Sequence, residues 1–486
     1  MDKIIWLSVL PPIIAIAMAI WSRQILPALL SGLLVGGYLL HPTWTGGFET
    51  AAESIVKLLS DKSNLQVLLF LYLFSGLIAL IKKSGGIIAF SEKIKKYVHN
   101  EKGVFYTLWA LIPVTFIDCG FRIIGTGTIL RSLAEKNKVE KERLAFMLNN
   151  TASPIVEIIP IATTFVGFNI ANINQGLKAA AIKDQSAYSI LLHAIPFEFF
   201  SIAVLLITFS TIYYQWKKIS RKAKHTNQSN KKETHKKNMP KAGSGAMSMD
   251  TEDKKPEIEP RIINLILPMV VVILLSFFFF WFFGSDNTDD NLTLLSIITA
   301  TDPNKAMLVA LSISIAITGF VYSLQKYNVK QMTDDFISGA NEIMPTLAIL
   351  TLAWSLAAVS QDLGLSNLVK VQLSGSLPVW SIPVALFILS SVVTYFIGEG
   401  WGAASLIMPF AIPLAVSASA GIPLCVAAVI TGGTFGDTTS PVAGMTNMSS
   451  NVLRADHMKY LRYASPFNFA AAGIAAVFFL IAGLYH

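Results

Sequence analysis

Residues 262–284 read IINLILPMVVVILLSFFFFWFFG, a stretch of apolar side chains without a single charge. With a rise of about 1.5 Å per residue, a helix of this length crosses the ~30 Å hydrocarbon core of a bilayer. Of the 486 residues, 53% are hydrophobic and 14% are charged, and the mean hydropathy is +0.56. The sequence therefore predicts an all-α, polytopic membrane protein. Comparable apolar stretches occur at residues 4–20, 25–40, 65–81, 189–214, 306–324 and 465–486.

The net charge of +8 comes from one segment of the chain. Residues 217–255 contain twelve Lys and Arg against four Asp and Glu, and they are rich in Asn, Ser and Thr. This composition is typical of a disordered linker, and its positive charge favours the cytoplasmic side of the membrane. We therefore divide the chain into a first half (1–214), a basic cytoplasmic linker (215–261) and a second half (262–486). We expect contact with membrane lipid and no nucleic-acid partner.

Two basic loops, at 82–103 and 135–143, predict a re-entrant hairpin. Both are expected in the cytoplasm, and the apolar residues between them are too few for two comfortable spans. Residues 104–134 are therefore predicted to enter the membrane and return to the same side. Residues 379–419 show the same pattern, interrupted at 398–400, and are predicted to enter from the outside. Each half then has five spans and one hairpin, and the two halves have opposite orientations in the membrane.

Short sequence matches between the halves support an internal repeat. Phe-Ile-Asp at 116–118 parallels Phe-Ile-Gly at 396–398, and Thr-Ala-Ser-Pro at 151–154 parallels Thr-Thr-Ser-Pro at 438–441. Gly86 and Gly364 occupy similar places after the third span of each half. Inverted repeats with interrupted helices place a binding site near the middle of the bilayer, where the repeats meet.

Polar residues gather around the two Ser-Pro sequences and the two hairpin tips. Proline inside a helix leaves backbone carbonyls without donors, and Na⁺ prefers oxygen ligands such as carboxylates, hydroxyls and carbonyls. Carboxylates at membrane depth are costly and usually functional. The alternative is that these residues only kink packed helices. The candidate ion- or substrate-binding residues are Asp118, Arg122, Asn150, Thr151, Ser153, Glu157, Glu399, Asp437, Thr438, Ser440, Thr446 and Asn447; those for a Na⁺ site are Glu157, Asp437, Ser153 and Ser440.

Other charged residues leave two interpretations open. Arg122 lies one helical turn after Asp118, so it either pairs with Asp118 to stabilise the hairpin or binds an anionic group of a substrate. Glu198 and His193 lie near the start of the apolar stretch at 189–214. We expect both of them at the membrane interface rather than among the ligands.

Around the hairpins and the Ser-Pro sequences, the chain resembles the NhaC-type Na⁺/H⁺ antiporter family of the ion-transporter superfamily. The resemblance implies a transport domain with two hairpins that moves against a scaffold, and exchange of Na⁺ for protons or organic ions. The chain departs from the family pattern at Cys119, Arg122, Gly400 and Gly444, and Glu157 and Glu399 are additional acids. The matching stretches are Phe-Ile-Asp at 116–118, Gly-Thr-Gly-Thr at 125–128, the sequence at 151–154, Trp-Gly at 401–402 and Gly-Asp-Thr-Thr-Ser-Pro at 436–441.

We therefore expect a secondary active transporter of the bacterial inner membrane, most simply a Na⁺/H⁺ antiporter. In this interpretation Asp437 and Glu157 exchange Na⁺ and protons, because protonation discharges a carboxylate at membrane depth. The alternative is a Na⁺-coupled carrier of amino acids or organic anions, with Arg122 on the substrate carboxylate. Two interrupted, inverted elements disfavour a channel, and the sequence shows no metal cluster or nucleophile–base pair of an enzyme. No cofactor is expected apart from Na⁺ and H⁺ as transported ions, and a homodimer stays open.

Overall fold

The computed structural model describes residues 7–137, 139–161, 163–182, 184–212, 257–285, 302–368 and 378–485. The described residues are mostly helical and include no strand, which agrees with the predicted all-α class. Within these described ranges, six helices are long and apolar enough to cross a membrane, or seven if the bent pair near Glu198 is one span. Most of the basic linker predicted at 215–261 lies outside the described residues.

The described helices divide between the two predicted halves as follows. The first half contains α2 (Leu10–Ser22), α3 (Ile25–Leu40), α4 (Gly46–Leu59), α5 (Lys62–Lys83), α6 (Gly86–Ile94), α7 (Glu101–Ala110), α8 (Ile112–Thr115), α9 (Cys119–Asn137), α10 (Lys141–Asn150), α11 (Ser153–Ile158), α12 (Thr164–Ala179), α13 (Ala187–Ala194), η1 (Ile195–Phe197) and α14 (Phe199–Ser210). The second contains α16 (Ile263–Ser285), α18 (Pro303–Leu324), α19 (Val329–Asn341), α20 (Met344–Asp362), α21 (Leu365–Leu368), α22 (Ser381–Ile397), α23 (Gly400–Ser417), α24 (Ile422–Thr439), α25 (Gly444–Val452) and α26 (His457–Tyr485).

Helix breaks occur where the sequence predicts them. The first hairpin changes direction between α8 and α9, and the second between α22 and α23. Gly398 makes the second turn with a φ of 80°, a conformation that side chains other than glycine rarely adopt. The two Ser-Pro sequences separate α10 from α11 and α24 from α25, because proline cannot continue the hydrogen bonding of a helix.

Glycines in the left-handed region also mark the turn after the third span of each half. They are Gly85 and Gly364, with φ values of 73° and 90°. Gly85 lies one residue before Gly86, the residue that the sequence match pairs with Gly364. The internal repeat and the opposite membrane orientation of the two halves stay predictions.

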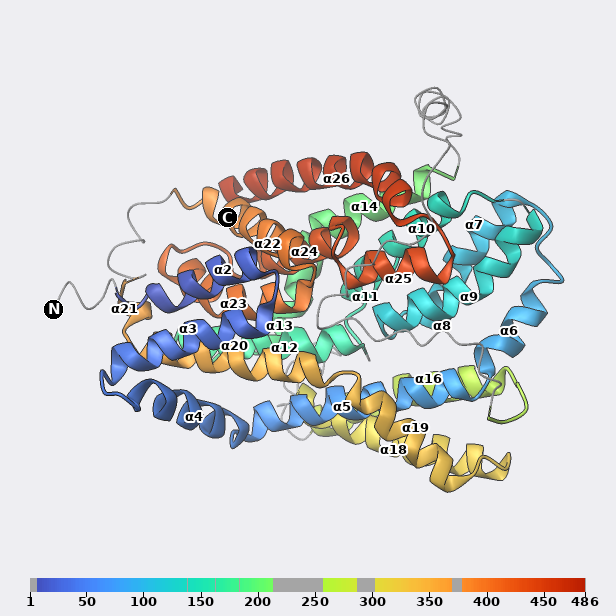
Figure 1. Cartoon of the computed structure of the whole chain (residues 1–486), viewed down its shortest axis with the longest axis horizontal. Helices are drawn as coiled ribbons and strands as arrows, with labels where there is room; N and C mark the ends of the chain where they lie inside the picture. The colour runs from blue at the N-terminus through green and yellow to red at the C-terminus, as the bar shows by residue number, and fades with distance from the viewer. Residues whose placement is uncertain are drawn as a thin grey trace.

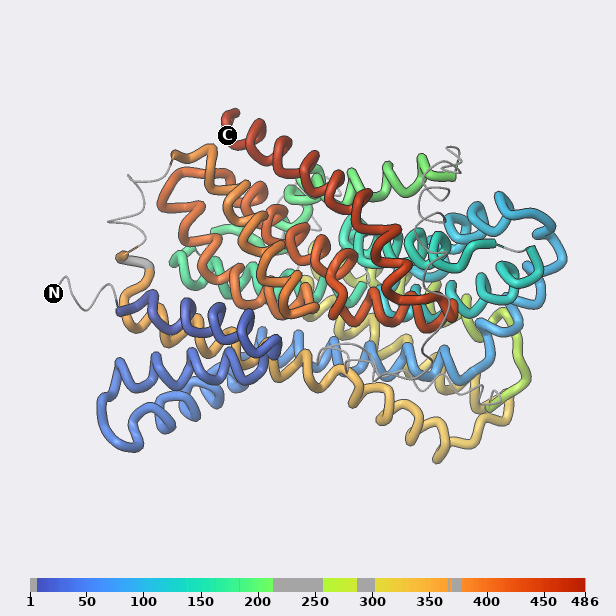
Figure 2. The backbone as a smooth tube through the Cα atoms, turned by 45° about the horizontal axis from the view of Figure 1, so that its top comes forward, coloured from blue at the N-terminus to red at the C-terminus, as the bar shows by residue number. Residues whose placement is uncertain are grey.

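Two layers of helices run roughly along the long axis of the molecule (Figure 1). We call α3, α4, α5, α16, α18, α19 and α20 the α5 layer, and α7–α11, α14, α22 and α24–α26 the α24 layer. Within each layer the helices contact one another, and α12 and α23 contact members of both. The tube in Figure 2 shows the α5 layer along the lower side and the α24 layer above it.

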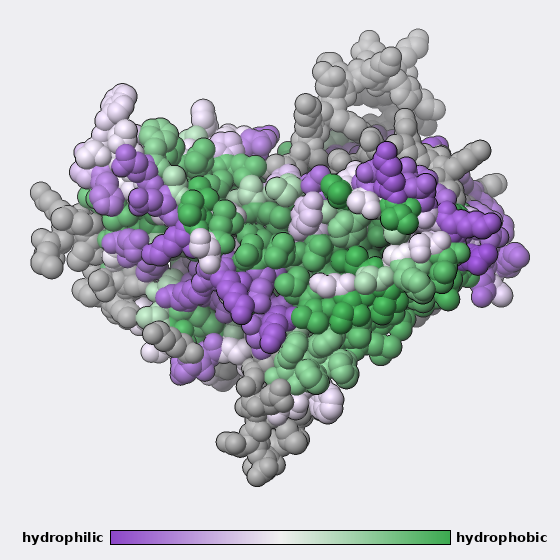
Figure 3. Space-filling view, turned by 90° about the horizontal axis from the view of Figure 1, so that it is seen from below, coloured by the Kyte–Doolittle hydropathy of each residue, from purple (hydrophilic) through white to green (hydrophobic). Residues whose placement is uncertain are grey.

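The face in Figure 3 carries large apolar areas, separated by a band of polar side chains that runs from the left to the middle and by a second polar group at the right. Exposed aromatic and aliphatic residues of α16 and α26, such as Phe277, Trp281 and Phe478, contribute to the molecular surface. Water does not favour so much exposed apolar area, whereas lipid does. The surface therefore agrees with a multi-pass membrane protein.

Candidate functional site

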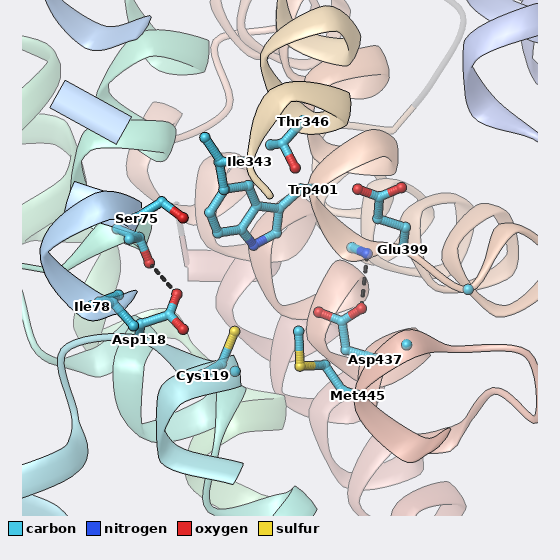
Figure 4. Close-up of a pocket in the computed structure, with 15 residues that line it drawn as sticks. Ser75, Ile78, Asp118, Cys119, Ile343, Thr346, Glu399, Trp401, Asp437 and Met445 are labelled. Carbon is cyan, nitrogen blue, oxygen red and sulfur yellow. Dashed lines mark hydrogen bonds between the residues drawn. The ribbon is translucent and has the colours of Figure 1, made fainter. Parts of the chain in front are cut away.

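A cavity with about 660 Å³ of empty space, including its opening, lies between the two layers. Ser75 and Ile78 of α5 and Ile343 and Thr346 at the start of α20 form one wall. The other wall comes from both hairpin tips and from the break between α24 and α25. Figure 4 shows how these side chains face one another. The remaining lining residues are Asp118, Cys119, Gly120, Thr164, Gly398, Glu399, Gly400, Trp401, Asp437, Gly444 and Met445.

Asp437 lies in the last turn of α24 and faces the first residue of α23. Its Oδ1 accepts a hydrogen bond of 2.8 Å from the backbone N–H of Gly400, so the carboxylate is bound at a helix N-terminus, where the helix dipole favours negative charge. A Cβ on Gly400 would lie 2.8 Å from Asp437 Oδ2 and 3.0 Å from the Gly433 carbonyl oxygen. Glycine at position 400 therefore permits this contact between the second hairpin and α24.

Asp118 occupies the tip of the first hairpin. It accepts a hydrogen bond of 2.8 Å from the Phe121 N–H and one of 2.9 Å from the Thr164 hydroxyl. Lys82 lies one turn beyond Ile78 on α5. Its charge interacts more strongly with Glu342 than with Asp118. Asp118 is thus fixed by hydrogen bonds and partly compensated by a positive charge outside the cavity wall.

Glu399 lies at the tip of the second hairpin, directly before α23. Its side chain is only 9% exposed, and its Oε2 has no hydrogen-bond partner among the described residues. No described basic side chain lies within ion-pair distance of this carboxyl group or of Asp437. Two acids of the cavity wall are therefore without a positively charged neighbour in the described part of the chain.

A smaller cavity of about 200 Å³ adjoins the first and has Glu157, Trp401 and Asp437 in its wall. Glu157 accepts a hydrogen bond of 2.8 Å from Ser201 of α14 and a second one from Thr434 of α24. The structure thus places Glu157 and Asp437, the two acids predicted to exchange ions, on a common cavity.

Glu198 is a correction to the sequence prediction, because it is fully buried and not interfacial. It lies at the bend of 44° between α13 with η1 and α14. Its carboxyl group is close enough to interact electrostatically with that of Glu157. Neither of its oxygens has a hydrogen-bond partner among the described residues. His193, in contrast, is exposed on the protein surface, and its place at the membrane interface stays a prediction.

Arg122 does not pair with Asp118, and it lines neither cavity. Its Nε and Nη2 donate to the carbonyl and the hydroxyl of Thr151, at 2.5 and 2.9 Å. Nη1 donates to Thr115 at 2.8 Å and Nη2 to the Leu108 carbonyl at 3.3 Å. The guanidinium therefore ties the first hairpin to the break between α10 and α11. The predicted ion pair with Asp118 is therefore wrong, and the role of Arg122 as a substrate ligand stays a prediction.

Most hydroxyls and amides at the two breaks satisfy backbone carbonyls or one another. Ser440 donates a hydrogen bond of 2.6 Å to the Tyr395 carbonyl, and Thr446 donates one of 2.8 Å to the Ser440 carbonyl. Thr438 and Asn447 bond to carbonyls of their own helices, Asn150 donates to Asn468, and Ser153 is buried beside Cys119. None of these six predicted residues lines either cavity. The predicted Na⁺ set is therefore separated: Glu157 and Asp437 share a cavity, and Ser153 and Ser440 do not belong to it.

Several residues of the site carry no signal in the sequence. Thr164, Thr346 and Ser75 are ordinary polar residues in apolar helices, and only folding brings them to the cavity. Asn149 donates 2.9 Å to Tyr460 and 3.3 Å to the Thr438 carbonyl, which joins the two broken helices. Of these four residues, only Asn149 could have been predicted from the sequence, because it lies close to the first Ser-Pro sequence.

Replacing Arg122 by Gln is expected to destabilise the protein by about 3–5 kcal/mol, since it leaves buried carbonyls without donors. Adding Asp118→Asn should not restore stability, because Asp118 is not the partner of Arg122. Thermal unfolding of the purified variants measures both effects, with Arg462→Gln on the exposed face of α26 as the matched control. Rescue by the double change would contradict the hydrogen-bonding role assigned to Arg122.

Comparisons with known proteins agree with this architecture. The model of the Na⁺/H⁺ antiporter family matches residues 158–484, which is more than half of the chain. An uncharacterized protein of Haemophilus influenzae is 25% identical over 493 residues, covering 99% of this chain and 91% of that protein. The matched family region includes the second hairpin, Glu399 and Asp437, and begins after the first Ser-Pro break.

Two solved transporters have a similar fold. The YdaH transporter of Alcanivorax borkumensis superposes with a TM-score of 0.57 at 15% identity, covering 97% of this chain and 98% of that chain. MtrF of Neisseria gonorrhoeae, described as one of a class of antimetabolite efflux pumps, gives 0.53 at 12% identity and covers 91% of this chain and 85% of its own. At these identities the likeness concerns the fold alone. With the family match, it shows that this chain is a member of the Na⁺/H⁺ antiporter family with the fold of a secondary transporter.

Proposed function

We propose that the protein is a Na⁺/H⁺ antiporter of NhaC type in the bacterial inner membrane, in which Na⁺ and protons compete for Asp437. The observation that carries the proposal is the cavity wall, with three carboxyl groups and, among the described residues that line it, no Lys, Arg or His. Na⁺ is a substrate here, and its preferred ligands are oxygens of this kind.

The position of the cavity supports transport rather than permanent binding. Its walls belong to different layers, so a displacement of one layer against the other changes the side from which Asp437 is reached. Alternating access in transporters with broken helices works in this way. The N–H of Gly400 and the dipole of α23 hold the carboxylate in place while either Na⁺ or a proton neutralises it.

The alternative, a Na⁺-coupled carrier of amino acids or organic anions, has less support. It depends on Arg122 as the residue that binds a carboxylate, and the donors of Arg122 are directed at Thr151, Thr115 and Leu108. Three carboxyl groups in the cavity wall also repel an anion. The geometry therefore favours a cation as the cargo.

Proteoliposomes with an acidic lumen and an internal pH indicator test the proposal. Addition of external Na⁺ is expected to make the lumen alkaline, because protons leave as Na⁺ enters. Addition of K⁺ and vesicles without protein serve as controls. Absence of a Na⁺-dependent pH change in correctly inserted protein would contradict antiport, and a Na⁺ flux without counterflow would indicate a channel.

A further inference from the structure

We propose that the cavity between the two hairpin tips also accepts a small organic cation, a primary ammonium ion with a short apolar chain. The inference rests on the proposed cation exchange at Asp437 and extends it to a second class of substrate. It depends on the charge, the unsatisfied acceptor and the apolar walls of the cavity.

The charge of the wall selects the sign of the ligand. Asp118, Glu399 and Asp437 all line the cavity, whereas no basic side chain of the described part of the chain does so. Of these three acids, Lys82 interacts electrostatically with Asp118, and its interaction with Glu342 is stronger. A cation that enters this space meets two acids, Glu399 and Asp437, that have no positively charged neighbour in the described part of the chain, and an anion is repelled.

Glu399 provides an acceptor that the protein itself does not use. Its Oε2 is buried and unpartnered among the described residues, while both oxygens of Asp118 and Oδ1 of Asp437 already accept hydrogen bonds. A buried acceptor without a donor is costly. An ammonium group has three N–H donors and no acceptor, so it suits Glu399.

Beside the acids and three hydroxyl side chains, the wall has a large apolar part, and the cavity is larger than Na⁺ requires. Ile78, Ile343, Trp401 and Met445 line the cavity together with the acids, and Figure 4 shows Trp401 and Ile343 beside the space that the acids surround. The Trp401 ring is held by Phe168 at 4.6 Å and Phe165 at 5.4 Å between ring centroids. A hard cation is held by oxygens only about 2.5 Å away, which leaves these apolar side chains for an alkyl chain.

The test uses n-butylammonium, with butyrate as its potassium salt and butyramide as anionic and neutral analogues. We expect n-butylammonium to displace radioactive Na⁺ from the purified full chain and to raise its melting temperature. Butyrate and butyramide should do neither. Glu399→Gln should weaken n-butylammonium binding at least about tenfold, and more than it weakens Na⁺ binding, because a buried charge partner is lost. Glu53→Gln, on the exposed face of α4, is the matched control and should change neither.

The outcomes separate this inference from the proposed function. If Na⁺ binds but n-butylammonium neither competes nor stabilises, or if the analogues bind equally well, the inference is overturned and cation exchange stands. If Na⁺ does not bind, the proposed function fails, and thermal stabilisation by n-butylammonium alone still decides whether the cavity selects organic cations. An equal loss of both ligands in Glu399→Gln would contradict the role assigned to Glu399.

Discussion

Asp437→Asn is expected to abolish Na⁺-driven proton movement while leaving insertion and folding intact. The amide oxygen still accepts the hydrogen bond from Gly400, so the shape of the site is kept. The substitution removes the charge that compensates the desolvation of Na⁺ and the group that takes up the proton. Loss of a buried charge partner typically costs 2–5 kcal/mol, so Na⁺ affinity should fall by roughly a hundredfold.

Binding of radioactive Na⁺ and vesicle pH measurements, made on the same preparation, check this expectation. Asp362→Asn is the matched control, since Asp362 is exposed at the end of α20 and should tolerate the same chemical change. Retained transport with an unchanged Na⁺ dependence in Asp437→Asn would show that this carboxylate has only a structural role.

Gly400→Ala is expected to damage the site through one added methyl group. The new Cβ would lie 2.8 Å from Asp437 Oδ2 and 3.0 Å from the Gly433 carbonyl oxygen, so the carboxylate or the start of α23 must shift. Overpacking of this kind costs about 1–3 kcal/mol. We expect a corresponding loss of stability together with at least about a tenfold loss of Na⁺ affinity, because 1.4 kcal/mol corresponds to a factor of ten.

Gly473→Ala is the control for this prediction, because a Cβ at that position of α26 meets no atom within 4 Å. It should leave Na⁺ affinity unchanged and stability the same or slightly higher, since alanine is the better helix former. Equal Na⁺ affinity in Gly400→Ala and Gly473→Ala would contradict the close contact between α23 and the Asp437 carboxylate.

Local sequence chemistry was enough to predict the membrane fold and its interruptions. Apolar runs such as 262–284 contain no charge, and this stretch forms α16 almost as predicted. The breaks at Ser153 and Ser440 follow from the prolines beside them, and the turn at Gly398 follows from its left-handed conformation. These features depend on the residue itself and its immediate neighbours, which a single sequence contains.

Long-range contacts explain what the sequence did not predict. Arg122 lies one turn from Asp118 but bonds to Thr151, which is 29 residues away. Glu198 lies two residues after a proline, near the start of an apolar stretch, and only the bend between α13 and α14 and the packing around it bury the side chain. The break hydroxyls looked like ligands, because their use by carbonyls such as that of Tyr395 depends on tertiary structure.

Competition between Na⁺ and protons at Asp437 is the central claim, and proton release on Na⁺ binding tests it most directly. Na⁺ is added to purified protein in a weakly buffered solution with a pH indicator, and Na⁺ binding is measured in parallel by calorimetry. The account predicts acidification in proportion to the Na⁺ bound, none with K⁺, and none in Asp437→Asn. Na⁺ binding to the wild-type protein without proton release, or equal release from Asp437→Asn, would contradict it.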